Sequence, residues 1–158
     1  MPFRFHCSQG DASPIEIPAI GLSLRVPLTP ELSGGAATVI ETVNQPGFGP
    51  PLHRHPQTEV FRVLEGQYLY ICDGQRFEVG EGAVVSIPGG AAHTFVNITD
   101  RPARQYILIL PALDAVPFFT ELGETMQGGL PDTAKLSEWG RRWQVEFLGP
   151  PLSATDRA

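Results

Sequence analysis

Short runs of β-forming residues, bounded by glycine, proline, aspartate or asparagine, follow one another along the middle of the chain. Each run is rich in β-branched and aromatic residues, and no helical period competes with them between residues 36 and 112. The dipeptide Asp73-Gly74 between two of the runs is typical of a hairpin turn. The runs are ATVIETVN, EVFRVLEG, QYLYICDG, QRFEVGEG, AVVSIPGG, AHTFVNIT and RQYILILPA. We therefore predict an all-β architecture, closed as a barrel or packed as a sandwich.

The segment before this span contains one further run with a period of two. In GLSLRVPL, the side chains of Leu22, Leu24 and Val26 fall on one face of an extended chain. The sequence ELSGGAA that follows indicates a break. We expect a strand here, placed before the main β-rich span.

The pattern changes again after Leu113. The segments LDAVPFFTELGETM and DTAKLSEWGRRW are typical of two short amphipathic helices. Asp114 and Asp132 are expected as N-caps, and Gly123 and Gly140 as the residues at which the helices stop. The last residues, QVEFLGPPLSATDRA, indicate an extended segment and a frayed tail.

The length of 158 residues is that of one domain. We expect a single domain over residues 1–158, with a barrel over about 36–112. An N-terminal strand extension would occupy residues 1–35, and a helical annex residues 113–158.

Charge and cysteine content restrict the class of protein. The net charge of −6 gives no basic footprint, so nucleic acid is not an expected partner. The N-terminus has no secretory pattern, and no apolar run approaches the roughly 18 residues that span a bilayer. Cys7 and Cys72 form no CxxC pair, which indicates free thiols in a reducing compartment. We expect a cytoplasmic protein without a membrane partner.

Candidate chemistry is concentrated in PLHRHPQTEVFRVLEGQ, residues 51–67. His53, His55 and Glu59 have the same parity, so in one regular strand all three side chains would share a face. Ionisable groups that converge inside a barrel need compensation, and a divalent cation would provide it, since imidazole and carboxylate suit transition metals. A lone HxH pair is weak evidence, because so short a spacing arises by chance.

Two longer patterns strengthen this interpretation. The first is G-x5-H-x-H-x3-E-x6-G, which runs from Gly47 to Gly66. The second is G-x5-P-x-G-x2-H-x3-N, in which a Pro-Gly-Gly bend precedes His93 and would direct it inward as a further ligand. Asn97 ends the second pattern and is expected to be structural, bonding the backbone.

These two patterns resemble both signature motifs of the cupin superfamily, and the chain resembles small single-domain cupins, with a weaker likeness to quercetin dioxygenase. The resemblance implies a double-stranded β-helix, or jelly-roll barrel, with short C-terminal helices added here. It implies that His53, His55, Glu59 and His93 bind one divalent transition metal ion, with Fe, Mn, Ni, Cu and Zn all compatible. Cupins commonly form homodimers, and residues 20–28 are a candidate segment for crossing between barrels.

The expected function is that of a metal-dependent oxidoreductase, most simply a dioxygenase acting on a small enol-bearing or aromatic substrate. Glu59 would stay a ligand or act as a catalytic base. A metal-dependent isomerase, decarboxylase or lyase remains an alternative, as does a non-enzymatic ligand-binding protein. The residues expected to form apolar walls of the pocket are Phe61, Val63, Val85, Ile87 and Phe95.

Other residues carry weaker signals. His6 has no patterned partner and is expected at the surface. Trp139 and Trp143 lie four apart and are expected to pack against the barrel, while Tyr68 and Tyr70 share a face of undecided orientation.

Overall fold

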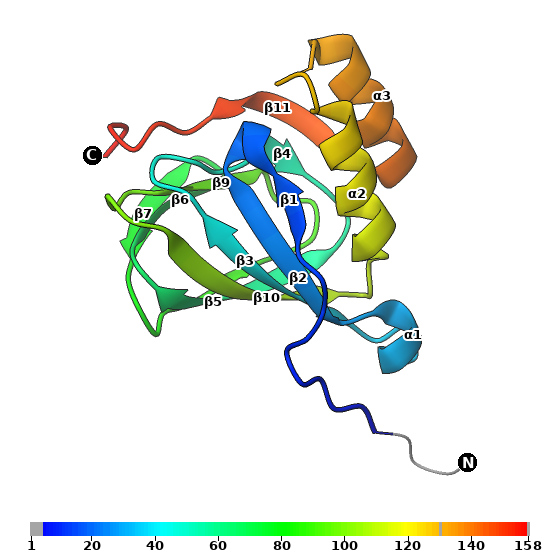
Figure 1. Cartoon of the computed structure of the whole chain (residues 1–158). Helices are drawn as coiled ribbons and strands as arrows, with labels where there is room; N and C mark the ends of the chain where they lie inside the picture. The colour runs from blue at the N-terminus through cyan, green and yellow to red at the C-terminus, as the bar shows by residue number, and fades with distance from the viewer. Residues whose placement is uncertain (1–4, 130, 158) are drawn as a thin grey trace.

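Two antiparallel sheets face each other and enclose one interior (Figure 1). The computed structural model describes residues 5–129 and 131–157. The six-stranded sheet has the order β1 (Ile15–Ile17), β2 (Leu22–Leu28), β3 (Thr38–Asn44), β10 (Ala103–Leu110), β5 (Thr58–Glu65) and β8 (Val84–Ile87). The five-stranded sheet has the order β11 (Glu146–Pro151), β4 (Pro51–Arg54), β9 (His93–Asn97), β6 (Tyr68–Cys72) and β7 (Gln75–Val79). The prediction of an all-β jelly-roll with short C-terminal helices is confirmed.

The predicted hairpin joins β6 to β7. Asp73 and Gly74 both have positive φ, 45° and 81°, between the paired residues Cys72 and Gln75. Two consecutive positive φ angles match the twist of a two-residue hairpin, which explains the preference for aspartate and glycine there.

The strand predicted before the main span is β2, in which Leu24 and Val26 are buried and Leu22 is half-buried. It pairs with β3 of the same chain. Three short elements were not predicted, because each is only one turn or one bridge long. They are β1, the 3₁₀ turn η1 (Pro18–Ile20) and α1 (Pro30–Ser33).

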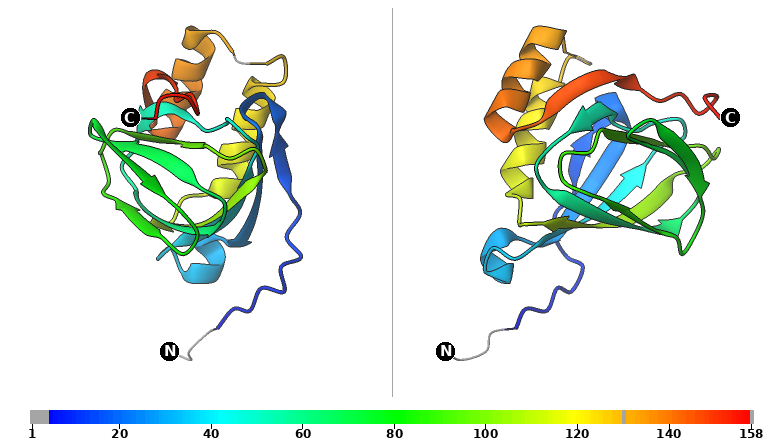
Figure 2. Two further views of the ribbon diagram at one scale, coloured as in Figure 1. Left: turned by 90° about the vertical axis from the view of Figure 1, so that its left-hand side faces the viewer. Right: turned by 180° about the vertical axis from the view of Figure 1, so that it is seen from behind.

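Both predicted C-terminal helices are present and close one end of the barrel (Figure 2). They are α2 (Ala115–Thr125) and α3 (Thr133–Trp143). Asp132 caps α3 by accepting a 2.8 Å hydrogen bond from the Lys135 backbone N–H. Asp114 occupies the N-cap of α2 but makes no side-chain capping bond. None of the helices in the described part of the chain is long and apolar enough to span a membrane.

The prediction that Gly123 and Gly140 end the helices is wrong, since both lie inside them. Gly140 is required by packing: a Cβ there would lie 2.3 Å from the carbonyl oxygen of Val145. Helix α3 instead ends at Gln144, which adopts the left-handed conformation with φ 60°.

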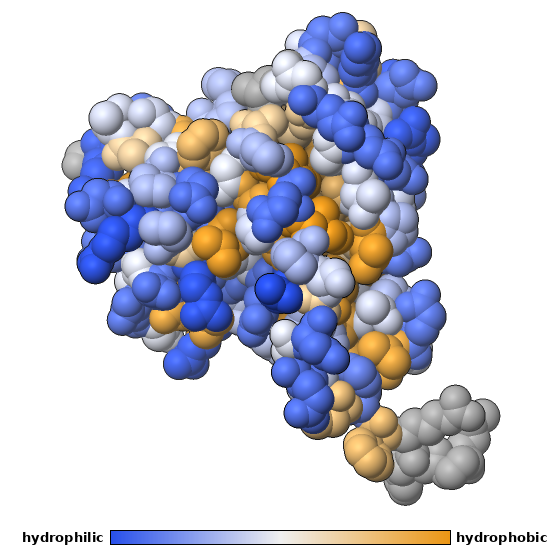
Figure 3. Space-filling view, viewed as in Figure 1, coloured by the Kyte–Doolittle hydropathy of each residue, from blue (hydrophilic) through white to orange (hydrophobic). Residues whose placement is uncertain are grey.

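The buried apolar residues form two clusters. One fills the barrel and includes Phe61, Tyr70 and Phe95. The second, here called the annex cluster, lies where the helices meet the barrel and consists of Ile17, Ile20, Leu122, Met126, Trp139 and Val145. Half-buried residues such as Leu22 pack against both clusters, and Figure 3 shows hydrophobic side chains gathered where β1 and β2 meet α2. Barrel and helices are therefore joined by a continuous apolar contact.

Candidate metal centre

His53 on β4 and His93 at the start of β9 are directly opposed in the five-stranded sheet. Their ring centroids lie 4.4 Å apart. Directly opposed residues of antiparallel strands project to the same face, so both imidazoles point into the barrel.

His55 and Glu59 reach the same place by a different route from the one predicted. Strand β4 ends at Arg54, the chain turns at His55 and Pro56, and Glu59 lies on β5 in the other sheet. The expectation of one regular strand carrying His53, His55 and Glu59 is therefore wrong. Proline has no N–H for a ladder bond, so the pairing of β4 stops here and the chain crosses between the sheets.

The Pro-Gly-Gly bend of the second motif packs against this turn. Gly90 N–H donates to the His55 carbonyl oxygen at 2.8 Å, and Gly89 N–H donates to Thr58 Oγ1 at 3.1 Å. A Cβ on Gly89 would lie 2.0 Å from the Pro56 carbonyl oxygen. Close backbone approach thus explains the glycine at position 89, and the two motifs hold each other in place.

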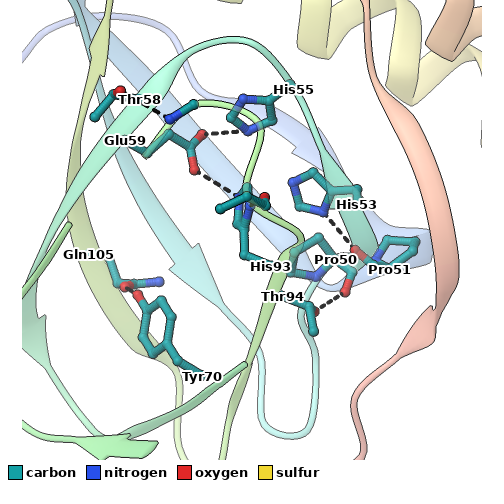
Figure 4. Close-up of polar contacts among 12 residues, drawn as sticks. Pro50, Pro51, His53, His55, Thr58, Glu59, Tyr70, His93, Thr94 and Gln105 are labelled. Atoms are coloured by element: carbon teal, nitrogen blue, oxygen red, sulfur yellow. Dashed lines mark hydrogen bonds and ion pairs between the residues drawn. The ribbon is translucent and has the colours of Figure 1, made fainter. Parts of the chain in front are cut away.

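The structure brings all four predicted residues together (Figure 4). One nitrogen from each of His53, His55 and His93 lies within 4.8 Å of the other two. The Glu59 carboxylate lies between two of the rings, with Oε1 at 3.4 Å from His55 Nε2 and Oε2 at 3.3 Å from His93 Nε2. The four side chains form a compact group of three imidazoles and one carboxylate.

Backbone carbonyls fix the tautomers of two of the imidazoles. His53 Nδ1–H donates to the Pro51 carbonyl oxygen at 2.7 Å, and His93 Nδ1–H donates to the Ala91 carbonyl oxygen at 2.9 Å. A carbonyl oxygen only accepts, so the lone pair of each neutral ring is on Nε2. This is the arrangement in which a second hydrogen bond orients a metal-binding histidine.

Burial and neighbouring groups keep His53 and Glu59 in the ionisation states that suit metal binding. Burial, with a smaller contribution from the nearby His93, lowers the pKa of His53 to about 3. Burial alone would raise the pKa of Glu59, but the neighbouring rings of His55 and His93 outweigh it and hold the pKa well below its usual range. Burial likewise lowers the pKa of His93, but Glu59 more than reverses this and leaves it raised. At neutral pH, His53 is neutral and Glu59 is anionic.

The donor set fits a divalent transition ion. His93 Nε2 and His55 Nδ1 are buried and have no hydrogen-bond partner among the described residues. With Nδ1 protonated, the His93 Nε2 lone pair faces a carboxylate oxygen at 3.3 Å, so two acceptors oppose each other. A cation or a proton between them removes this repulsion. Imidazole and carboxylate are ligands that such ions accept.

A cavity of about 120 Å³ extends from this group toward the annex cluster. Of the predicted walls, Phe61 and Phe95 line the cavity, whereas Val63, Val85 and Ile87 are buried in the core and do not. Sequence analysis missed many of the lining side chains, and a group of them comes from the helical annex and β11: Phe118, Phe119, Leu122, Met126, Trp139 and Phe147. The aromatic residues in the two predicted amphipathic helices were the feature of the sequence that could have identified this part of the wall. No lysine or arginine lies among the described lining residues.

The other residues singled out in the sequence lie outside the metal centre. Asn97 donates through Nδ2 to the carbonyl oxygens of Asn44 and Arg101, which confirms its structural role. Tyr68 and Tyr70 are fully buried in the core of the barrel, so the face that they share points inward. His6 is exposed, as expected.

Comparison with known proteins gives concordant matches. The family model described as "Cupin domain" matches residues 40–109, which include all four site residues. An uncharacterized protein of Methanocaldococcus jannaschii is 30% identical over 86 residues, 53% of this chain and 69% of that protein.

Among solved structures, a predicted oxalate decarboxylase of Thermotoga maritima superposes with a TM-score of 0.62 at 18% identity, covering 68% of this chain and 100% of that one. An RmlC-like cupin of Shewanella frigidimarina gives a TM-score of 0.60 at 16% identity, covering 72% and 96%. At these identities, the likeness of both structures to this chain is one of fold.

Proposed function

Because the chain belongs to the cupin superfamily, we propose that it is a metal-dependent enzyme whose single divalent ion is held by His53, His55, Glu59 and His93. The ion would be Fe, Mn, Ni, Cu or Zn, all of which accept this donor set. The fold hosts many activities, so the reaction has to be argued from the site itself.

The substrate class is inferred from the composition of the cavity wall. The cavity begins at His53, His55 and Glu59, and its described walls contain no cationic side chain. Phosphates and dicarboxylates are normally recognised by arginine or lysine in addition to any metal. A small, neutral, partly apolar substrate with an enolic or aromatic oxygen fits this wall better.

The proposed reaction is that of a dioxygenase. A bound ion would supply Lewis-acid and redox chemistry at the histidine end of the cavity. Glu59, kept ionised between His55 and His93, is placed to accept the proton of a substrate enol or to remain a ligand. Phe61 and Phe95 would hold the substrate body and exclude water from the reacting end.

The experiment begins with elemental mass spectrometry on protein purified without a histidine tag or added metal. Near-stoichiometric Fe, Mn, Ni or Cu supports the proposal, and metal at background contradicts it. Oxygen uptake is then measured with compact enols and with flavonols. Turnover that persists without oxygen would select an isomerase, decarboxylase or lyase, and tight binding without turnover a ligand-binding protein.

We also propose that the protein forms a homodimer and is located in the cytoplasm. In this chain β2, the segment considered for exchange between barrels, pairs with β1 and β3 of its own barrel. Light scattering coupled to size-exclusion chromatography measures the mass in solution and tests the dimer directly.

A further inference from the structure

Two residues that line the cavity outside the metal centre each carry a buried polar atom with no hydrogen-bond partner among the described residues. These atoms are Thr42 Oγ1 on β3 and Trp139 Nε1 on α3. Thr42 is 4% exposed and Trp139 is 2% exposed, so neither is paired with bulk solvent. A buried donor or acceptor left unpaired destabilises the folded state, which makes such atoms rare in folded proteins.

Other threonines and the other tryptophan of the chain show that partners are normally found. The Thr38 hydroxyl donates to the Leu113 carbonyl oxygen at 2.6 Å, and the Thr94 hydroxyl to the Pro50 carbonyl oxygen at 2.7 Å. Trp143, one turn along α3 from Trp139, donates its Nε1–H to Glu121 Oε2 at 2.7 Å. None of these three paired side chains lines the cavity. The unpaired hydroxyl and the unpaired indole N–H thus belong to residues that line the cavity.

The two atoms lie on different elements from the proposed metal ligands. Thr42 shares the inward face of β3 with Ile40 and Asn44, and all three line the cavity. Trp139 belongs to the annex cluster. Outside the metal centre, the other polar side chain of this wall is that of Asn44, whose Oδ1 already accepts from the Tyr68 hydroxyl. Thr42 and Trp139 can therefore provide specific polar contacts on a largely apolar surface.

We propose that Trp139 Nε1–H and the Thr42 hydroxyl bind a neutral oxygen substituent on the ligand, remote from its metal-binding end. This rests on the proposed function, and it narrows the ligand to a compact compound with two oxygen functions. One is a chelating enol or hydroxy-ketone, and the other is a hydroxyl or carbonyl group. An indole N–H only donates, whereas a threonine hydroxyl donates or accepts, so each group can bond to an oxygen substituent of the ligand. An anionic substituent is disfavoured because no cation lines the wall.

Two simple probes differ only in the proposed group. Kojic acid is a hydroxypyranone with a hydroxymethyl substituent, and allomaltol carries a methyl group in its place. Both present the same chelating hydroxy-ketone to a metal. Binding of each to the metal-loaded protein is measured by calorimetric titration. We expect kojic acid to bind about tenfold more tightly, which corresponds to one net hydrogen bond at a buried site.

The variants Thr42→Val and Trp139→Phe remove the proposed polar contacts. In each variant, kojic acid should bind at most about twofold more tightly than allomaltol, while the affinity for allomaltol and the metal content stay the same. Trp143→Phe is the matched control and keeps the full preference. Thr42→Val has a second readout: its melting temperature without ligand should equal or exceed that of the unaltered protein, since an unpaired polar atom is replaced by an isosteric methyl group. Thr38→Val, which removes a paired hydroxyl, should lower it.

The outcomes separate this inference from the proposed function. Metal-loaded protein that binds both probes equally, or whose preference survives both variants, overturns the inference and leaves the metal centre standing. Metal-loaded protein that binds neither probe also overturns it. Protein that takes up no metal at all contradicts the proposed function, and the inference falls with it.

Discussion

His53 and His93 face each other across β4 and β9, and each ring donates its Nδ1–H to the carbonyl oxygen of the residue two positions before it in the chain. The same local arrangement is thus made twice, with Pro51 as acceptor for one ring and Ala91 for the other. It leaves the Nε2 lone pair free on both rings, and that of His93 faces the Glu59 carboxylate at 3.3 Å. This relationship underlies the predictions that concern metal binding.

Replacing His93 should abolish metal binding. In His93→Ala, one of the converging nitrogens is removed, and metal content is expected to fall from near one ion per chain to background. Elemental mass spectrometry measures this, and circular dichroism checks that the fold persists. His6→Ala, at an exposed histidine outside the cluster, should keep full metal content. Full metal content in His93→Ala would refute the proposed ligand set.

Removal of the metal should lower the stability of the unaltered protein. An ion that binds only the folded chain adds about 2.7 kcal/mol at a free concentration one hundred times its Kd. A chelator should therefore reduce the denaturant midpoint of the unaltered protein and leave that of His93→Ala unchanged. An equal decrease in both proteins would show that the chelator acts elsewhere.

Without metal, the stability of the protein should fall as the pH decreases from 7 to 5. The pKa of His53 is about 3 in the folded chain against 6.5 ordinarily, so between these values the unfolded state binds more protons. Stability then decreases as the pH falls, by about 2 kcal/mol at pH 5 for this group. His93 and Glu59 also titrate, so the informative quantity is the difference from His53→Asn. That variant should show a shallower pH dependence, and an identical slope would contradict the assignment.

Gly89→Ala should weaken metal binding although it alters no ligand. The added Cβ would lie 2.0 Å from the Pro56 carbonyl oxygen, so the turn that carries His55 must move. We expect metal affinity to fall about tenfold or more, as for loss of a supporting contact around a metal site. Gly128→Ala is the control, because a Cβ at that position would have no neighbouring atom within 4 Å. Metal titration of both variants provides the comparison, and equal affinities would argue that the bend is not needed.

Asn97→Ala should destabilise the barrel while the metal site stays intact. The side chain is fully buried and donates to the carbonyl oxygens of Asn44 and Arg101, and Thr99 donates back to its Oδ1. Loss of these bonds leaves buried acceptors unpaired, at a cost of about 2–4 kcal/mol in unfolding free energy. Chemical denaturation measures this. A large loss of metal with unchanged stability would instead point to a role at the site.

Much of the fold was predictable because its signals are local. The alternation of apolar residues in β2, the Asp73-Gly74 turn and the Asp132 cap each depend on neighbouring residues in the chain. The helix ends at Gly123 and Gly140 were predicted wrongly, because both glycines lie inside helices, and Gly140 is required by the close approach of the Val145 backbone and not by helix termination.

The amino-acid sequence by itself determined which residues meet at the candidate site, since the spacing in both motifs identified His53, His55, Glu59 and His93. It did not determine how they meet. The tertiary structure decided that Pro56 breaks the expected strand, so that His53 and Glu59 come from facing sheets. It also decided that Thr42 and Trp139 line one cavity, because packing between strand and helix joins residues that no local period relates.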